Sequence, residues 1–337
     1  MSASSIRRGQ TRDGWLFVAP AVLLLAVFLA FPVLMALWVS VSDWRGVGSP
    51  FSGDVGFVGA DNYTNILSGG SLQQRDFGTA MRNNVYYVLL VVPLQTAVAL
   101  GLAVLLHAKA LKGRGFFRTA FYFPSVTSAV AITVLWLFLF NSTGAVNAIL
   151  GWVGIDGPNW FGDARGVLHT ALGAVGVDAP AFLTDHRTLG ISWWEWLAGP
   201  SFAMSAFILL AVFTTSGTFM LLFIAALNNI GDEVEEAGMV DGANAWQRFW
   251  HLTLPMVRPT LFTVLTLGLI GTWQVFDQIY TGTQGGPAKT TLTPAYLSFQ
   301  TSFNSQRWGE GAAIAFILFA IIVVLTLLQR WALREKS

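Results

Sequence analysis

No cysteine occurs among the 337 residues of the chain, and histidine occurs only four times. The absence of cysteine excludes disulfide bonds, thiolate metal sites and cysteine nucleophiles. The four histidines are scattered, with no pair at the spacing of metal ligands. They are His107, His169, His186 and His251. We therefore expect no structural metal in this chain.

Charge is also scarce, because charged residues make up 11% of the chain while hydrophobic residues make up 54%, and the mean hydropathy is +0.59. A soluble globular domain carries about a quarter of its residues as charged groups, so this composition excludes that class. The net charge of +1 favours neither nucleic acid nor an acidic partner. The composition predicts an all-α integral membrane protein surrounded by the lipid bilayer.

Six windows are long enough and apolar enough to cross a bilayer, which needs about 20 helical residues. These windows are residues 15–41, 84–106, 119–140, 202–227, 260–280 and 312–329. Arginines precede the first window, as in a signal peptide, but its uncharged run is too long and no cleavage site follows. We expect a tail over residues 1–14 and one transmembrane domain over residues 15–337.

Lysine and arginine gather before the first window, between the second and third windows, and after the last. They are Arg7, Arg8, Arg12, Lys109, Lys112, Arg114, Arg118, Arg330, Arg334 and Lys336. The opposite loops carry acidic residues, namely Asp43, Asp54, Asp61, Asp76, Asp156, Asp163, Asp178, Asp185 and Glu195. By the positive-inside rule both termini are cytoplasmic. The loop 141–201 is then extracytoplasmic, and the polar segment 228–258 lies on the cytoplasmic side.

The segment between the fourth and fifth windows predicts two short helices on the cytoplasmic side. We call this pair of helices the knob. Asp232 to Met239 reads as an acidic helix, and Gly242 supplies the left-handed residue that stops it. A second helix is expected from Ala243 to His251, ending before Pro255. The alternative is an amphipathic hairpin that only caps its own helix ends.

The ordered string of this segment resembles the "EAA" coupling loop of binding-protein-dependent importer permease subunits. The residues that carry this resemblance and would contact the ATPase are Glu235, Glu236, Ala237, Gly238, Asp241, Gly242, Ala243, Phe249 and Pro255. Two positions depart from the family pattern: Gly231 stands where proline is frequent, and Gly238 replaces an alanine. Both departures reduce helix stiffness.

The C-terminal third resembles the carbohydrate branch of these permeases, which includes the larger maltose and the glycerol-phosphate permease subunits. The matching runs are Phe276–Tyr280, Thr283–Pro287, Thr291-Leu292 and Gly309–Ala313. The resemblance implies a multi-pass subunit of a prokaryotic inner or plasma membrane. Its partners would be a second, homologous permease in a heterodimer, a dimeric ATP-binding subunit and an extracytoplasmic solute-binding protein. ATP and Mg would be bound by the ATPase, with no cofactor on this chain.

Catalysis is not indicated by any motif. The run 285–290 comes closest to a phosphate-binding P-loop, but it lacks the glycine before the lysine. We therefore expect a non-catalytic subunit that does not hydrolyse ATP itself. An ATP-independent channel or facilitator, in which the knob binds a regulator, is the alternative, and a membrane scaffold is a third.

The fifth window offers a surface for a sugar. Trp273, Asp277 and Tyr280 share one helical face by their i, i+4 and i+7 spacing, with Gln274 and Gln278 beside it. An aromatic ring can cover the C–H face of a sugar while amides and carboxylates bind hydroxyls. The alternative is that Trp273 and Tyr280 pack between helices while Asp277 caps or pairs locally.

Weaker candidates for the substrate path lie on the fourth window, at Thr214, Thr215 and Thr218, because threonine in a membrane helix usually bonds its own backbone. The six windows contain no lysine or arginine. This absence favours neutral sugars over phosphate-bearing solutes.

The loop 141–201 is long and rich in tryptophan, and its 161–195 stretch exceeds the length usual in the family. The tryptophans are Trp152, Trp160, Trp193, Trp194 and Trp196. Tryptophan is enriched at membrane–water interfaces, so we interpret these residues as interfacial anchors. The alternative is contact with an external binding protein through a shaped cap.

Overall fold

The computed structural model describes residues 3–107, 112–177 and 179–332. Lys109, Asp178, Arg334 and Lys336, which contributed to the predicted orientation, lie outside these residues. The chain divides into two compact units. One unit joins Met1–Ile66 with Ser298–Phe316, and the other joins Leu67–Leu297 with Ile317–Ser337.

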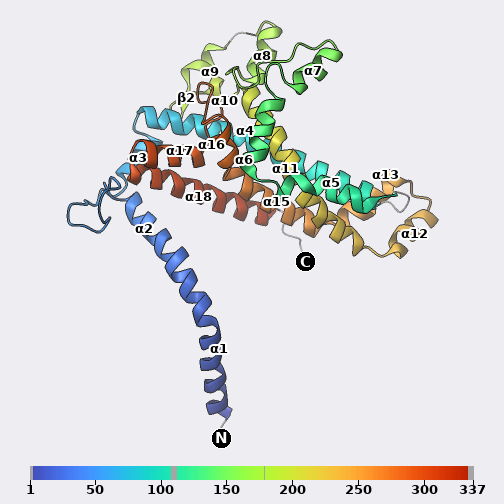
Figure 1. The fold of residues 1–337 in the computed structure, drawn as a ribbon, viewed down its shortest axis with the longest axis horizontal. Coiled ribbons are helices and arrows are strands. Elements are labelled where there is room, and N and C mark those ends of the chain that lie inside the picture. Colours follow the sequence, from blue (N-terminus) through green and yellow to red (C-terminus); the bar gives the residue numbers. More distant parts are fainter. Residues whose placement is uncertain (1–2, 108–111, 178, 333–337) are drawn as a thin grey trace. The chain divides into compact units, whose positions relative to one another are not determined.

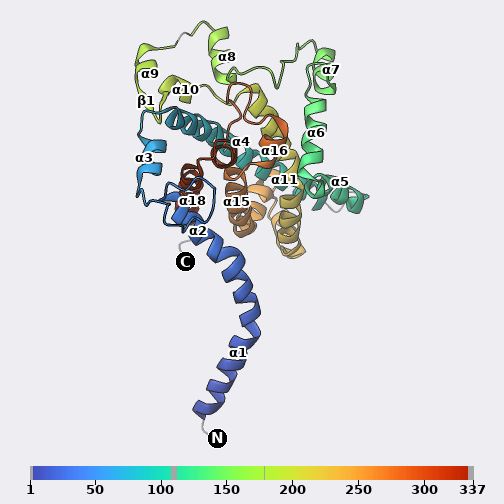
Figure 2. The same ribbon diagram turned by 60° about the vertical axis from the view of Figure 1, so that its left-hand side comes forward.

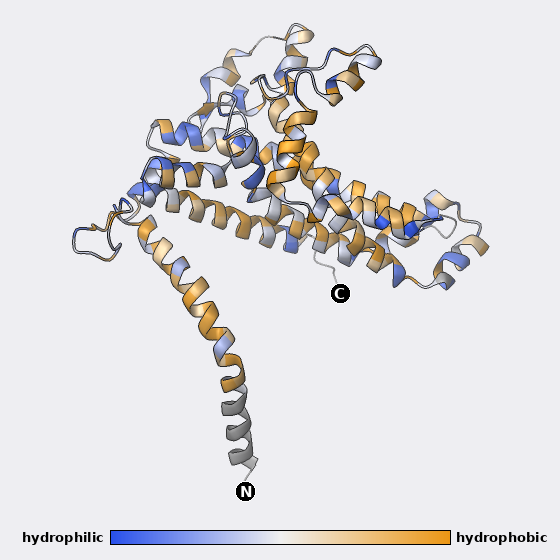
Figure 3. Ribbon diagram, viewed as in Figure 1, coloured by the Kyte–Doolittle hydropathy of each residue, from blue (hydrophilic) through white to orange (hydrophobic). Residues whose placement is uncertain are grey.

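The first unit begins with a nearly continuous helix. Its parts are α1 (Ala3–Leu25), the π-helical turn η1 (Ala26–Ala30) and α2 (Phe31–Ser40). Figure 3 shows hydrophobic residues along α2. Only 6% of the apolar window in Gly14–Ser40 is buried. The first unit itself therefore covers little of this helix.

One side-chain amide links α3 (Asp61–Leu67) to the end of α2 in the first unit. Asn62 of α3 donates hydrogen bonds to the carbonyls of Ser40 (3.0 Å) and Ser42 (2.9 Å). The unit also contains the π-helical turn η3 (Gln300–Asn304) and the start of α18 (Trp308–Ala332).

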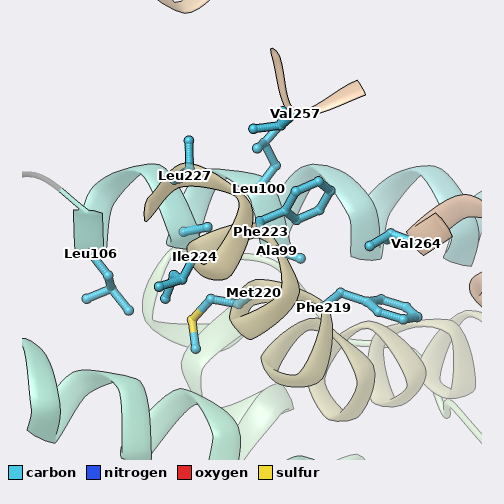
Figure 4. Packing of buried hydrophobic residues seen from close by; sticks show 11 residues of the cluster. Ala99, Leu100, Leu106, Phe219, Met220, Phe223, Ile224, Leu227, Val257 and Val264 are labelled. Atoms are coloured by element: carbon cyan, nitrogen blue, oxygen red, sulfur yellow. The ribbon is translucent and has the colours of Figure 1, made fainter. Parts of the chain in front are cut away.

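Three long helices organise the second unit. They are α4 (Leu72–His107), α11 (Phe202–Asn228) and α15 (Arg258–Trp273). Figure 4 shows their side chains in one buried cluster, with Phe223 and Val264 among them. Ala99 and Ala103 of α4 are fully buried there, and such small residues allow membrane helices to approach closely.

A bent helix pair occupies the span predicted over residues 119–140. The pair consists of α5 (Arg114–Val126) and α6 (Ala129–Leu139), inclined at 99° to each other. Thr127 and Ser128 have extended backbone between them. Ser125, Thr127 and Ser128 lie at or next to the bend, but the mean hydropathy of the whole window does not resolve so short a polar stretch. α5 lies across α11, since a Cβ on Gly217 would meet the Phe121 carbonyl oxygen.

The described part of the chain contains five helices long and apolar enough to cross a membrane, or up to six if the bent pair is one span. The second of these begins at Leu72, twelve residues before the predicted window at residue 84. Its extra turns carry charged residues, which a hydropathy window excludes. The fifth predicted window is interrupted after Trp273, and α16 (Asp277–Gly282) follows the break.

The loop 141–201 is a structured layer on the second unit. Its elements are α7 (Ala145–Trp152), α8 (Val167–Ala174), α9 (Ala181–Asp185), β1 (Arg187–Thr188), β2 (Ile191–Ser192) and α10 (Trp193–Trp196). β1 and β2 form an antiparallel hairpin, and these two strands are the sheet that the described residues add to the helices. In Figures 1 and 2, α9 and α10 lie beside the N-terminal end of α4.

The hairpin rests on α4 through a glycine. A Cβ added to Gly78 would lie 2.1 Å from the carbonyl oxygen of Leu189, so only glycine permits this approach.

The remaining elements of this unit are α12 (Asp232–Val240), α13 (Ala245–Arg248), η2 (Phe249–Thr253), α14 (Leu254–Met256) and α17 (Pro294–Phe299).

Candidate functional site

The first predicted knob helix ends at Gly242, as expected from the sequence. Gly242 has φ +77°. Its N–H donates to the Met239 carbonyl, and the N–H of Ala243 donates to the Gly238 carbonyl, both at 3.0 Å. This pair of bonds is the Schellman arrangement, which satisfies the last carbonyls of a helix. The left-handed residue is therefore what turns the chain from α12 into the next helix.

Gly238 allows the two halves of the knob to pack closely. A Cβ at this position would lie 2.7 Å from Cδ1 of Leu252 and 3.2 Å from Cδ of Arg248. The Arg248 guanidinium also donates to the Ala243 carbonyl at 2.8 Å. Glycine in place of alanine at residue 238 thus permits contact between α12 and the helix that follows. The sequence interpretation considered only that glycine makes the helix less stiff.

The predicted second helix has different limits in the structure. Its N-cap is Asn244. The side-chain oxygen of Asn244 accepts a hydrogen bond from the Gln247 backbone N–H, and the side-chain oxygen of Gln247 accepts one from the Asn244 backbone N–H. The expected end before Pro255 is wrong. A π-helical turn, Phe249–Thr253, leads into α14, where Pro255 lies in the first turn. Proline is tolerated there because its missing N–H has no partner to lose.

The predicted coupling residues divide into exposed and anchored groups. The exposed ones are Glu235, Glu236, Ala237, Asp241, Gly242 and Pro255. Phe249 is half-buried and packs, with Leu254, against the buried cluster of α4, α11 and α15. The knob therefore presents carboxylates to its surroundings while its aromatic side is attached to the helix core.

Trp273 does not share a face with Asp277 and Tyr280, contrary to the helical-spacing prediction. The helix stops at Trp273 and restarts at Asp277, so the i, i+4 relation is lost. Trp273 is 4% exposed, whereas Tyr280 is 45% exposed and stacks on Phe276 with ring centroids 5.4 Å apart. The alternative, that both aromatic residues pack between helices, fits buried Trp273 but not exposed Tyr280.

A cavity of about 320 Å³ lies at this break in the helix. Its wall includes three of the predicted residues, Gln274, Asp277 and Gln278, but neither Trp273 nor Tyr280. We call it the amide cavity.

Gln95 is a lining residue of the amide cavity that the sequence analysis missed. It is fully buried in α4, and its side-chain oxygen accepts from the Thr215 hydroxyl at 2.6 Å. Its Nε2 has no hydrogen-bond partner among the described residues. The sequence signal for Gln95 was an amide in the middle of an apolar window. A buried polar group in a membrane helix needs a partner, so such a residue is a candidate for a functional site.

The threonines of α11 differ in position. Thr215 lines the amide cavity. Thr214 bonds the carbonyls of Leu210 and Ala211 in its own helix, and Thr218 is exposed outside the cavity lining. Of the three candidates, only Thr215 faces the same space as the amides.

The tryptophans of the loop 141–201 are mostly held by internal contacts. Trp194 stacks on His169 with ring centroids 4.4 Å apart, and Trp160 donates to the Asn147 side chain at 2.7 Å. Trp152 is 84% exposed. The loop is therefore structured by its own contacts, and both interpretations of its tryptophans stay predictions.

Comparison with known proteins gives one consistent answer. Residues 97–336 match the family described as "Binding-protein-dependent transport system inner membrane component". The lactose transport system permease protein LacF of Rhizobium radiobacter is 32% identical over 100% of this chain and 99% of its own. The arabinooligosaccharides transport system permease protein AraP of Halalkalibacterium halodurans is 28% identical over 94% of this chain and 85% of its own. The resemblance identified from the motifs is thereby confirmed.

The fold is also similar to a solved structure, that of a bacterial ABC transporter involved in the import of the acidic polysaccharide alginate. The TM-score is 0.69 with 20% sequence identity, covering 99% of each chain.

Proposed function

Because the chain belongs to the family of binding-protein-dependent transport system inner membrane components, we propose that it moves a sugar or oligosaccharide across the membrane, powered by a separate ATPase. It supplies no catalytic group for ATP hydrolysis. Its partners are a second homologous permease, a dimeric ATP-binding subunit and an extracytoplasmic solute-binding protein. Both of its termini are cytoplasmic, and the knob Asp232–Met256 is the surface that contacts the ATPase.

One observation carries this proposal: the helices that anchor the knob also line the amide cavity. Phe249 and Leu254 pack against the buried cluster that contains Phe219 of α11. Phe219 is itself part of the cavity wall, as is Gly268 of α15. A displacement of the knob is therefore passed by close packing to the walls of the cavity, which is the physical requirement for alternating access.

The chemistry of the amide cavity supports a sugar as the solute. Gln274, Gln278 and Gln95 provide amide donors and acceptors, and Asp277 provides a carboxylate. Hydroxyl groups of a sugar match such a set, since each both donates and accepts. The relatives named for lactose and for arabinooligosaccharides support the same class of solute.

Charge reversal on the knob tests the ATPase contact. Glu236→Lys should lower both the ATPase that copurifies with the permease and the rate of solute uptake, because an exposed carboxylate at the contact becomes a cation. Asp156→Lys is the matched control, since Asp156 is also exposed but lies in the loop 141–201. Normal uptake and normal ATPase recovery with Glu236→Lys, at normal membrane levels, would contradict the proposed contact.

A further inference from the structure

A second cavity, of about 850 Å³, lies at the N-terminal end of α4. Its walls come from the first turns of α4, from the 164–201 stretch and from the turn 288–290. It shares no lining residue with the amide cavity. The volume falls within the range of roughly 300–1,000 Å³ that small-molecule sites occupy. We call it the arginine cavity.

The lining of the arginine cavity is positively charged. Its charged residues are Arg75, Asp76, Arg82, Arg165, Glu195 and Lys289. Four cations and two carboxylates leave an excess of two positive charges on the wall. One of these is neutralised from outside the lining, because Asp163 accepts hydrogen bonds from the Arg165 guanidinium at 2.7 to 3.1 Å.

Two of the remaining cations are matched by the carboxylates of the wall. Lys289 pairs with Asp76 at 2.7 Å, and Arg75 pairs with Glu195 at 3.6 Å. Partial burial of Glu195 favours its neutral form. Hydrogen bonds from Ser192 and the charges of Arg75 and Arg82 outweigh this effect and hold the pKa of Glu195 below its ordinary value. One carboxylate thus faces two guanidinium groups.

Arg82 is the cation without a carboxylate of its own. Its three hydrogen bonds among the described residues go to neutral oxygens: the Glu195 backbone carbonyl at 3.3 Å, and the Asn83 side-chain oxygen twice, at 2.9 and 3.3 Å. A guanidinium has five N–H donors, so two remain for a ligand. Its half-buried position makes a further charged hydrogen bond stronger than at an open surface.

We infer that the arginine cavity binds a sugar that carries a carboxylate, a uronate unit, with that carboxylate on Arg82. The guanidinium fork matches the two oxygens of a carboxylate. The cavity has room for the ring, and Thr79, Thr170 and Ser201 of its wall supply hydroxyl groups for the ring hydroxyls. This inference rests on the proposed function, because it makes the cavity a site that a solute occupies before it reaches the amide cavity.

The sequence favoured neutral sugars because the six windows hold no cation, and Arg82 lies two residues before the window that begins at residue 84. The windows themselves still hold no cation, but the inferred site replaces the preference for neutral sugars, because its cation lies outside the predicted spans.

Direct binding tests the inference without ATP and without transport. The full transporter complex in detergent is titrated with cellobiouronic acid and with cellobiose, which differ by one carboxylate, and binding is followed by calorimetry. The acidic disaccharide should bind at least about tenfold more tightly, as expected for a charge-assisted hydrogen bond. Arg82→Gln should remove most of this difference. Arg187→Gln, on the exposed strand β1 and outside the cavity lining, should keep it.

A second variant keeps the test decisive if Arg82→Gln fails to fold. Ala174→Glu places a carboxylate on an exposed lining position of α8 and removes no hydrogen bond. It should weaken binding of cellobiouronic acid about tenfold and leave cellobiose unchanged.

Equal affinities for the two sugars, no binding of either, or unchanged binding in Ala174→Glu would overturn the inference. Binding of the acid only when the solute-binding protein is present would also overturn it, because the carboxylate would then be recognised elsewhere. Failure of ATP-driven uptake with this binding intact would instead count against the proposed function alone.

Discussion

The turn at Gly242 gives a sharp quantitative prediction, because a nearby glycine serves as its control. A Cβ at Gly231 or at Gly242 would meet nothing within 4 Å, so neither position is limited by space. They differ in backbone: Gly231 has φ −63° and Gly242 has φ +77°. An L-residue in the left-handed region costs about 1–2 kcal/mol. Gly242→Ala should therefore favour opening of the turn about 5- to 30-fold, whereas Gly231→Ala should not.

Hydrogen exchange measures this opening directly. The N–H groups of Gly242 and Ala243 are bonded to the carbonyls of Met239 and Gly238, and they exchange when the turn opens. In Gly242→Ala these two amides should exchange about 5- to 30-fold faster than in the wild type, while the buried amides of α11 stay unchanged. Unaltered exchange at the turn would refute the assignment of Gly242 as the residue that holds the knob in shape.

Three further predictions follow from the second unit. Gln95→Leu should lower solute uptake at normal membrane levels, measured in vesicles, because it removes an amide from the cavity wall; uptake equal to wild type would exclude Gln95 from the path. Since the folded pKa of Glu195 is lowered, its stabilising effect is complete above its ordinary value of 4.5 and is lost as the pH falls through the lowered value. Glu195→Gln should thus make the protection of the loop amides around Ser192, taken relative to their intrinsic exchange rates, independent of pH in that acidic range, and a persisting dependence of this protection would contradict the prediction. Ser201→Ala removes the N-cap bond to the Met204 N–H, 3.0 Å long, and should destabilise the start of α11 by about 1 kcal/mol, seen as faster exchange there; an unchanged rate would argue against a contribution from the cap.

Much of the helix arrangement could be predicted from the sequence, because long apolar runs and helix-stopping residues are local signals. The window 202–227 corresponds to Phe202–Asn228, and the stop at Gly242 was identified from glycine alone. The beginning of α4 at Leu72 could not be found in this way. Its first turns carry Arg75, Asp76 and Arg82, which make the cavity wall instead of facing lipid.

The error in the predicted helical face of the fifth window has a physical cause. Helical spacing assumes an unbroken helix, and the break after Trp273 rotates Asp277 and Tyr280 away from that register. The cavity then depends on Gln95, which is more than 170 positions away in sequence and on another helix. Only the packing of α4 against α11 brings this amide to Thr215. The coupling-loop residues stay a prediction, and sequence alone could propose them because they lie in one continuous segment.

We propose that this chain passes a sugar through the membrane only when a partner hydrolyses ATP. The direct test is labelled-sugar uptake and ATP hydrolysis in liposomes that contain this chain with its second permease and ATPase, with and without the solute-binding protein. We expect uptake that requires ATP, together with hydrolysis that rises when the loaded binding protein is present. Uptake down a gradient at the same rate without ATP would contradict the proposed function and identify a channel or facilitator.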